Sequence, residues 1–182
     1  MALILDETQT GFRLHPGGAQ AHLGVAADLS IFGNQTGAGA PIGLVAGYAP
    51  WVSSGPARHN QDPLALAAAK AFLAELQQLG PQLQTRLNQS TAELVSRLNS
   101  HFQQGNIPLR LVALGSIFRV CAQQNIDLLF HHLLEMDVYA LDGRFLYLSA
   151  AHTQEDIDYL FWALTAGAEK LRQAGFFYPS AI

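Results

Sequence analysis

The first 62 residues alternate short apolar runs with loops that are rich in glycine. Three runs have the length of short strands, at residues 2–5, 29–32 and 43–47. Continuous apolar strands of this kind are typical of parallel sheets that are covered on both faces, as in α/β folds. Few helical segments accompany them, so we expect the faces and edges of this sheet to stay open within the chain.

From Asp62 onward the apolar positions follow a helical period. Asp62 suits the N-cap and Pro63 the first helical position, so the sequence predicts a helix that ends at Gly80 and Pro81. The apolar stripe of this helix is predicted to be Leu64, Ala67, Ala68, Ala71, Phe72, Leu76 and Leu79. A second helix is predicted over residues 82–104, with one apolar face made of Leu83, Leu87, Leu94, Leu98 and Phe102.

The remaining residues predict a mixed unit. We expect a strand over residues 109–122, broken at a central glycine, and then a helix over 126–135. Two strands joined by a turn should follow, at 138–141 and 145–148, and a last helix capped by Thr153. Residues 63–182 therefore form an expected α+β unit with a core of its own. Residues 1–62 do not.

The composition narrows the class of protein. Of 182 residues, 49% are hydrophobic and 13% charged, and the net charge is -4, which excludes a disordered chain and disfavours a nucleic-acid partner. The single cysteine, Cys121, cannot form an internal disulfide, so we expect a reducing, cytoplasmic setting. No apolar run is long enough for a bilayer, and no membrane partner is expected.

Asp6 is the first candidate for chemistry, because it follows an apolar strand directly. A carboxylate in that place needs a cationic or hydrogen-bonding partner, which a helix cap or a loop ion pair would also provide. His131 and His132 are adjacent on a predicted helix and cannot face one metal together, so no metal site is expected.

Three runs of sequence around Asp6 carry a family resemblance. The strings LILDETQTGFR, HLGVAADLSIFG and GAGAPIGLVAG resemble the class III family of pyridoxal-phosphate-dependent aminotransferases, of fold type I. Within it, residues 15–21 (HPGGAQA) look most like the glutamate-1-semialdehyde-aminomutase-like domains of cyanobacterial polyketide and peptide synthases. Further along, DPLALAAAKAFL and LSAAHTQEDID resemble a helix and a closing motif of the same family.

The resemblance assigns roles to residues near the first strand. Asp6 would hold the protonated pyridine nitrogen of pyridoxal 5'-phosphate (PLP), which keeps the ring an electron sink. Gln9 matches the family residue that hydrogen-bonds near the phenolic oxygen, although it can also be an ordinary loop glutamine.

The family's Schiff-base lysine is replaced. Where the family has Gly-Lys, this chain has Gly33 and Asn34, and an amide nitrogen is neither a nucleophile nor a base near pH 7. The chain's two lysines, Lys70 and Lys170, lie in predicted amphipathic helices, where a solvated role is expected. Catalysis by this chain alone is therefore not expected.

Two arginines are further candidates. Arg58 aligns with the family threonine that reaches the cofactor phosphate of the neighbouring subunit; it can bind a phosphate or be a solvated loop residue. Arg144 could face a substrate carboxylate or simply occupy a turn.

The resemblance implies an α/β chain that is the C-terminal portion of a fold type I transferase. Residues 1–62 would be a remnant of the PLP-binding large domain, and residues 63–182 the interdomain helices and the small C-terminal domain. The expected activity is that of an aminotransferase or aminomutase, truncated and inactive alone. The alternatives are a non-catalytic pseudoenzyme that serves in interaction, or one half of a split aminotransferase. Implied partners are a second copy or a complementing N-terminal half, and an acyl carrier protein if the setting is a synthase.

Overall fold

The computed structural model describes residues 1–53, 62–141 and 145–177. Contacts within the chain divide it into two compact units, Met1–Arg86 and Leu87–Ile182, which we describe separately as unit 1 and unit 2. The boundary expected after residue 62 separates two domains of the family's fold and not two compact units of this chain, and it stays a prediction. Within the described ranges no helix has the length and apolar character that a bilayer crossing requires.

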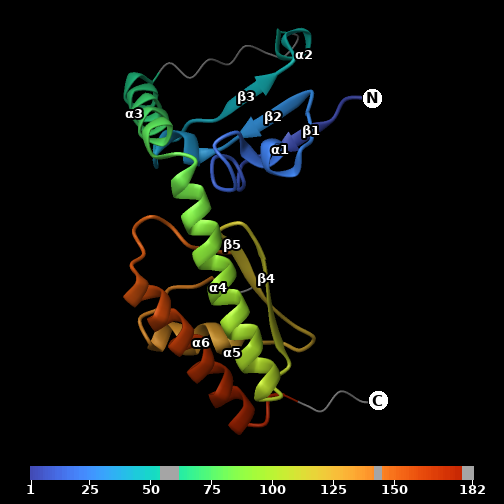
Figure 1. The fold of residues 1–182 in the computed structure, drawn as a ribbon, viewed down its shortest axis with the longest axis vertical. Coiled ribbons are helices and arrows are strands. Elements are labelled where there is room, and N and C mark those ends of the chain that lie inside the picture. Colours follow the sequence, from blue (N-terminus) through green and yellow to red (C-terminus); the bar gives the residue numbers. More distant parts are fainter. Residues whose placement is uncertain (54–61, 142–144, 178–182) are drawn as a thin grey trace. The chain divides into compact units, whose positions relative to one another are not determined.

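Unit 1 contains a sheet of three short strands in the order β1-β2-β3 (Figure 1). The strands are β1 (Ile4–Asp6), β2 (Leu29–Phe32) and β3 (Leu44–Gly47), so the three expected strands are confirmed. Strands β1 and β2 are parallel, whereas β3 runs antiparallel to β2, which corrects the expectation of a parallel sheet. The connection over residues 33–43 contains only a 3-10 turn, and a parallel return needs a longer crossover.

Much of this sheet is exposed. All four residues of β3 are exposed, and so is Ile4 of β1, although the apolar strands had predicted burial on both faces. The helices near the sheet, α1 (Gly18–Leu23) and α2 (Ala49–Ser53), are one or two turns long. They are too short to cover the strands, which agrees with the expectation of open faces and edges.

Helix α3 (Pro63–Leu79) supports the turn that follows β2. Its N-cap is Asp62, whose side chain accepts a hydrogen bond from the backbone N–H of Leu64 at 2.9 Å. The predicted stripe is wrong in part, because Leu64 is 76% exposed and the buried positions are Ala65 and Ala69. These two small residues pack with Ile42, and so bring α3 close to the 3-10 helix η1 (Asn34–Gly37).

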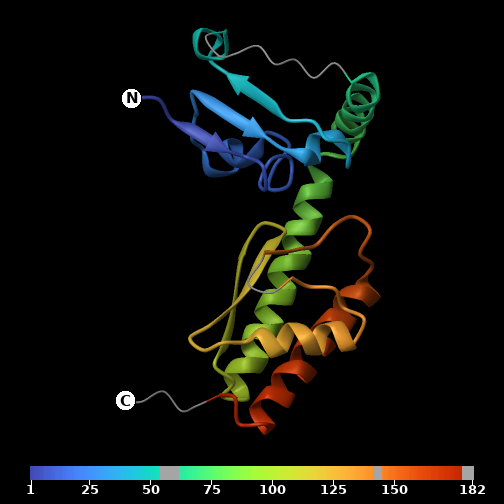
Figure 2. The same ribbon diagram turned by 180° about the vertical axis from the view of Figure 1, so that it is seen from behind.

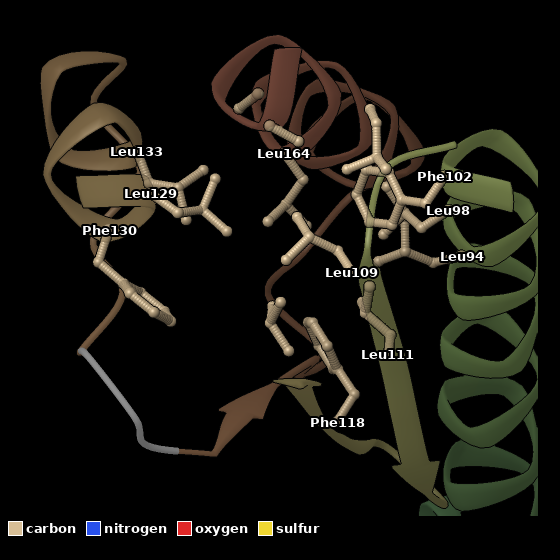
Figure 3. Packing of buried hydrophobic residues seen from close by; sticks show 14 of the residues in the cluster. Leu94, Leu98, Phe102, Leu109, Leu111, Phe118, Leu129, Phe130, Leu133 and Leu164 are labelled. Atoms are coloured by element: carbon tan, nitrogen blue, oxygen red, sulfur yellow. The ribbon is translucent and has the colours of Figure 1, made fainter. Parts of the chain in front are cut away.

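Helix α4 (Gln82–Gln104) starts in unit 1, and its residues from Leu87 onward belong to unit 2, together with a second sheet of antiparallel strands in the order β4-β5-β6. The strands are β4 (Leu109–Leu114), β5 (Ile117–Ala122) and β6 (Leu146–Tyr147). Helices α5 (Asp127–Glu135) and α6 (Gln154–Gln173) lie side by side (Figure 2). Leu94, Leu98 and Phe102 of α4 are fully buried, as predicted, and point toward β4 (Figure 3).

One edge of this second sheet is closed by a side chain. The amide of Asn99 on α4 accepts from the backbone N–H of Leu111 at 2.7 Å and donates to the Leu111 carbonyl at 3.0 Å. The amide thus satisfies both backbone groups that a neighbouring strand would use at that residue.

The strand predicted at 138–141 is wrong. The chain turns at Met136 and Asp137, and the backbone N–H of Val138 donates to the carbonyl of Leu133 at 2.8 Å. That donor closes the end of α5 and is not available to a β ladder. The expected turn at 142–143 falls outside the described residues.

The N-terminus of α6 is a capping box, as predicted. The Thr153 hydroxyl accepts from the backbone N–H of Asp156, and the Asp156 carboxylate accepts from the backbone N–H of Thr153 at 2.7 Å. The Thr153 backbone N–H, and then the Thr153 hydroxyl, donate to the Asp156 carboxylate, and these two bonds hold the pKa of Asp156 below its usual range.

We expect Thr153→Ala to lower the free energy of unfolding by about 1 kcal/mol, because one N-terminal N–H of the helix loses its acceptor. The Asp156 pKa is lower in the folded chain, so its contribution is present at neutral pH and is lost as the pH falls through the folded pKa. Urea unfolding at neutral and acid pH measures both effects. Thr153→Ser keeps the hydroxyl and serves as the control, and an equal loss in that variant would contradict the capping role.

Candidate functional site

The candidate site lies where the parallel strands β1 and β2 end. Asp6 is the last residue of β1 and pairs with Ile31 of β2; β2 ends one residue later, and Gly33 and Asn34 follow. Because β1 and β2 are parallel, their carboxyl ends lie at the same end of the sheet, and we call this end the strand edge. Figure 1 shows it beside α3. The crevice outside the carboxyl ends of such strands is the usual ligand site of open α/β sheets.

Asp6 presents an exposed carboxylate at this edge. Its Oδ1 accepts a hydrogen bond from the backbone N–H of Thr8 at 2.9 Å, which is a local turn contact and not a helix cap. Hydrogen bonds from the Thr8 side chain and then from its backbone keep the pKa of Asp6 below the usual value. The group is therefore ionised near neutral pH, as a site for a cationic ring nitrogen requires.

Gln9 follows Asp6 by three residues and is also exposed. Its backbone carbonyl accepts from Nε2 of Gln35 at 3.0 Å, and the same nitrogen lies 3.3 Å from the carbonyl of Thr8. Gln35 thus ties the loop after β1 to the turn after β2. Sequence reasoning missed it, and its position next to Asn34 is the one signal that could have drawn attention to it.

Glu7 is the second residue that sequence reasoning missed. It is 1% exposed, and its Oε2 accepts hydrogen bonds from the Thr10 hydroxyl at 2.7 Å and the backbone N–H of Ala19 at 2.8 Å. Its Oε1 accepts from the backbone N–H of Gln20 at 3.3 Å. Side chains alternate along an extended chain, so the carboxylate that directly follows an outward Asp6 could have been expected to point inward.

Aromatic packing holds the far end of the same loop. The ring of Phe12 stacks on Phe32 of β2 at 5.1 Å between centroids and meets Phe72 of α3 edge-on at 6.1 Å. The Phe12 carbonyl accepts from Nε2 of Gln84 at 3.0 Å. The loop is thus anchored beyond the site as well as at Glu7 and Gln35.

Asn34 is the first residue of η1, directly after the extended residue Gly33. A Cβ added at Gly33 would lie 3.2 Å from the Cβ of Thr8, so the chain after β2 runs close to the loop after β1. The structure therefore brings the backbone of Asn34 to the same edge as Asp6, and α3 packs against the turn that carries it.

The other candidates are not assembled at this edge. Arg58 and Arg144 fall outside the described residues, so their roles stay predictions. Lys70 is exposed on α3, and Lys170 of unit 2 lies 3.6 Å from Glu135, an ion pair in which both side chains are largely exposed. Over the described ranges, no group of three or more His, Cys, Asp or Glu side chains is arranged to hold a metal ion.

Comparison with known proteins shows which proteins the chain resembles. No family model matches it. The structure matches the fold of PLP-dependent transaminases, and the resemblance to class III aminotransferases is confirmed for the C-terminal portion of those proteins. The α/β fold expected from the sequence, the C-terminal part of a fold type I transferase, is thereby confirmed as well.

Three individual similarities illustrate the match. The chain is 31% identical over 193 residues to glutamate-1-semialdehyde 2,1-aminomutase of Alkaliphilus oremlandii, covering 94% of this chain and 45% of that protein. It is 26% identical to a β-phenylalanine aminotransferase of Variovorax paradoxus, with a TM-score of 0.77 over all of this chain and 46% of the other. A transaminase with PLP bound matches at 25% identity and a TM-score of 0.82, over 97% and 46% of the two chains. This chain thus spans under half the length of each.

Proposed function

We propose that this chain is the C-terminal part of a PLP-dependent aminotransferase or aminomutase, and that the carboxyl ends of β1 and β2 receive the pyridine ring of PLP. The observation that carries the proposal is the exposed carboxylate of Asp6, whose pKa is lowered by Thr8 and which lies at the edge of a parallel strand pair. A carboxylate at the ring nitrogen favours the protonated ring. When bound, PLP supplies an electron sink for charge that develops on the substrate.

The residues of this chain have separate tasks in the proposal. Asp6 holds the proton on the ring nitrogen, and Gln9 hydrogen-bonds near the phenolic oxygen. Arg58 would contribute to the phosphate site and Arg144 to a substrate carboxylate. Asn34 cannot bond covalently to the cofactor or accept a proton near pH 7, so the chain by itself holds PLP without turning over amines.

The alternative is that the chain works as one half of a split aminotransferase, or as a non-catalytic remnant that serves in interaction. The exposed apolar residues of unit 1 favour a covering partner; they include Leu3, Ile4, Leu44, Val45 and Trp51. Soluble proteins normally cover or pair such strands. A polypeptide with the N-terminal part of the fold, or a second copy of this chain, is the proposed partner. Failure to co-purify with such an N-terminal part would exclude the split enzyme.

Titration of the purified chain with PLP tests the binding. We expect saturable changes in PLP absorbance, and no borohydride-stable product beyond the slow background labelling of exposed amines, because no lysine is expected at the site. Asp6→Asn should weaken binding about tenfold, since a charge-assisted hydrogen bond to the ring is lost.

The matched control is Asp137→Asn, an exposed aspartate of unit 2 whose positive φ of 56° asparagine tolerates. It removes one carboxylate without touching the site and should leave PLP affinity unchanged. An unsaturable titration of the unaltered chain, or equal affinity for the two variants, would overturn the proposal.

A further inference from the structure

We propose that Glu7 is the positioning residue of this site: its buried carboxylate ties the loop after β1 to the start of α1, and so fixes the direction in which Asp6 presents its own carboxylate. The inference rests on the proposed function in one respect, namely that Asp6 is the group that faces the cofactor ring. Glu7 does not touch the ring, because its carboxylate is buried and its oxygens bond to Thr10, Ala19 and Gln20.

The first step is the alternation of the two carboxylates. Asp6 is the last residue of β1, and the backbone N–H of Glu7 continues the pairing by donating to the Ile31 carbonyl, so these two consecutive side chains are expected to point to opposite faces. Asp6 is exposed while Glu7 is 1% exposed. Fixing one of the two side chains on its own face therefore fixes the face on which the other is presented.

The second step is the set of donors that converge on Glu7. One hydroxyl and two backbone N–H groups reach its two oxygens, from Thr10, Ala19 and Gln20. A carboxylate only accepts, so it can take all three, whereas a glutamine would turn an NH₂ group toward at least one donor. The arrangement thus requires the acid and not merely a polar side chain.

The third step is the space made for the carboxylate. Gly18 has a φ of 74°, and a Cβ added there would lie 2.4 Å from Oε1 of Glu7. A side chain at residue 18 would therefore displace Glu7 as well as strain the backbone. The sequence thus provides a glycine at the residue whose Cβ would collide with the Glu7 carboxylate.

The last step connects Glu7 to Asp6. Glu7 donates its backbone N–H to the Ile31 carbonyl at 2.7 Å and accepts from Gly11 at 2.9 Å. The next backbone N–H along the chain, that of Thr8, is the one that bonds to Asp6. Gln35 holds the Thr8 carbonyl from the other side. Releasing the Glu7 side chain would leave this segment held by these backbone and Gln35 bonds alone, without its tie to α1, and the Thr8 donor would be held less firmly against Asp6.

A pH titration of Asp6 tests the inference without relying on PLP. In the full chain, side-chain carboxyl NMR should show the pKa of Asp6 below its ordinary value, and Glu7→Gln should raise that pKa toward the ordinary value because the Thr8 donor is released. The same variant should bind PLP about tenfold more weakly. Glu75→Gln, which changes an exposed glutamate of α3, should alter neither quantity.

The outcomes separate the two proposals. An unchanged Asp6 titration and unchanged PLP affinity in folded Glu7→Gln would overturn the positioning role. If that variant does not fold, Thr10→Val removes one of the three donors, and it should move both readouts in the same direction by less; no movement overturns the role. If the unaltered chain does not bind PLP, the proposed function fails, and the Asp6 titration still decides the role of Glu7.

Discussion

Asn34→Lys is expected to convert the chain into one that binds PLP covalently. The new amine would start from the turn after β2, at the same strand edge as Asp6, and would condense with the PLP aldehyde with release of water. Borohydride should reduce the linkage and make it permanent. Mass spectrometry of the reduced protein is expected to show stoichiometric addition, with the label on the peptide that contains residue 34.

Two controls make the result specific. Asn125→Lys adds a lysine at an exposed position of unit 2 and should give only the slow background labelling that any accessible amine undergoes. Asp6→Asn combined with Asn34→Lys should keep the covalent link but shift the protonation of the bound ring. Equal labelling at residues 34 and 125 would mean that the strand edge is not a PLP site.

Phe102→Ala is expected to produce the largest loss of stability, about 3–5 kcal/mol, because a fully buried ring is replaced by a cavity. Phe102 comes from α4 and lies in the same cluster as Leu94, Leu98 and Leu109 (Figure 3). A loss of this size is a large fraction of the stability of an ordinary domain. Urea unfolding followed by circular dichroism measures it, with the transition of unit 2 fitted separately if the two units do not unfold together.

Leu134→Ala is the matched control, since this leucine of α5 is 57% exposed. The free energy of unfolding of this variant should fall by no more than about 0.5 kcal/mol, as for other surface substitutions. A comparable loss in the two variants would show that the cluster around Phe102 is not the stabilising core of unit 2.

Helices were predictable where their signals are local. The period of apolar residues specifies α4, and the cap residue Thr153 specifies the start of α6. The direction of β3 was not predictable from local signals, because it depends on the absence of a crossover helix between β2 and β3. Val138 was misassigned for a similar reason: its backbone donor is used by Leu133 in a helix end that periodicity does not reveal.

The residues of the candidate site also differ in whether the sequence alone could reveal them. Asp6 and Asn34 could be found because each follows a recognisable strand within a family motif. The roles of Glu7 and Gln35 could not be predicted, because their partners lie in other segments of the chain: Glu7 bonds to Ala19 and Gln20, and Gln35 to the carbonyls of Thr8 and Gln9. Such contacts exist only after the strands have paired.

The two sheets differ in whether the outward backbone groups of their edge strands are occupied, and this difference affects how the isolated chain aggregates on storage. The Asn99 amide occupies the outer backbone groups of β4 at Leu111, so strand addition there is blocked. In unit 1, β1 and β3 each pair with β2 alone among the described strands, and they carry the exposed apolar residues Ile4, Leu44 and Val45. Aggregation of concentrated protein should therefore begin at these two outer strands of unit 1, and hydrogen exchange should show new protection within residues 4–6 or 44–47 before any change in β4.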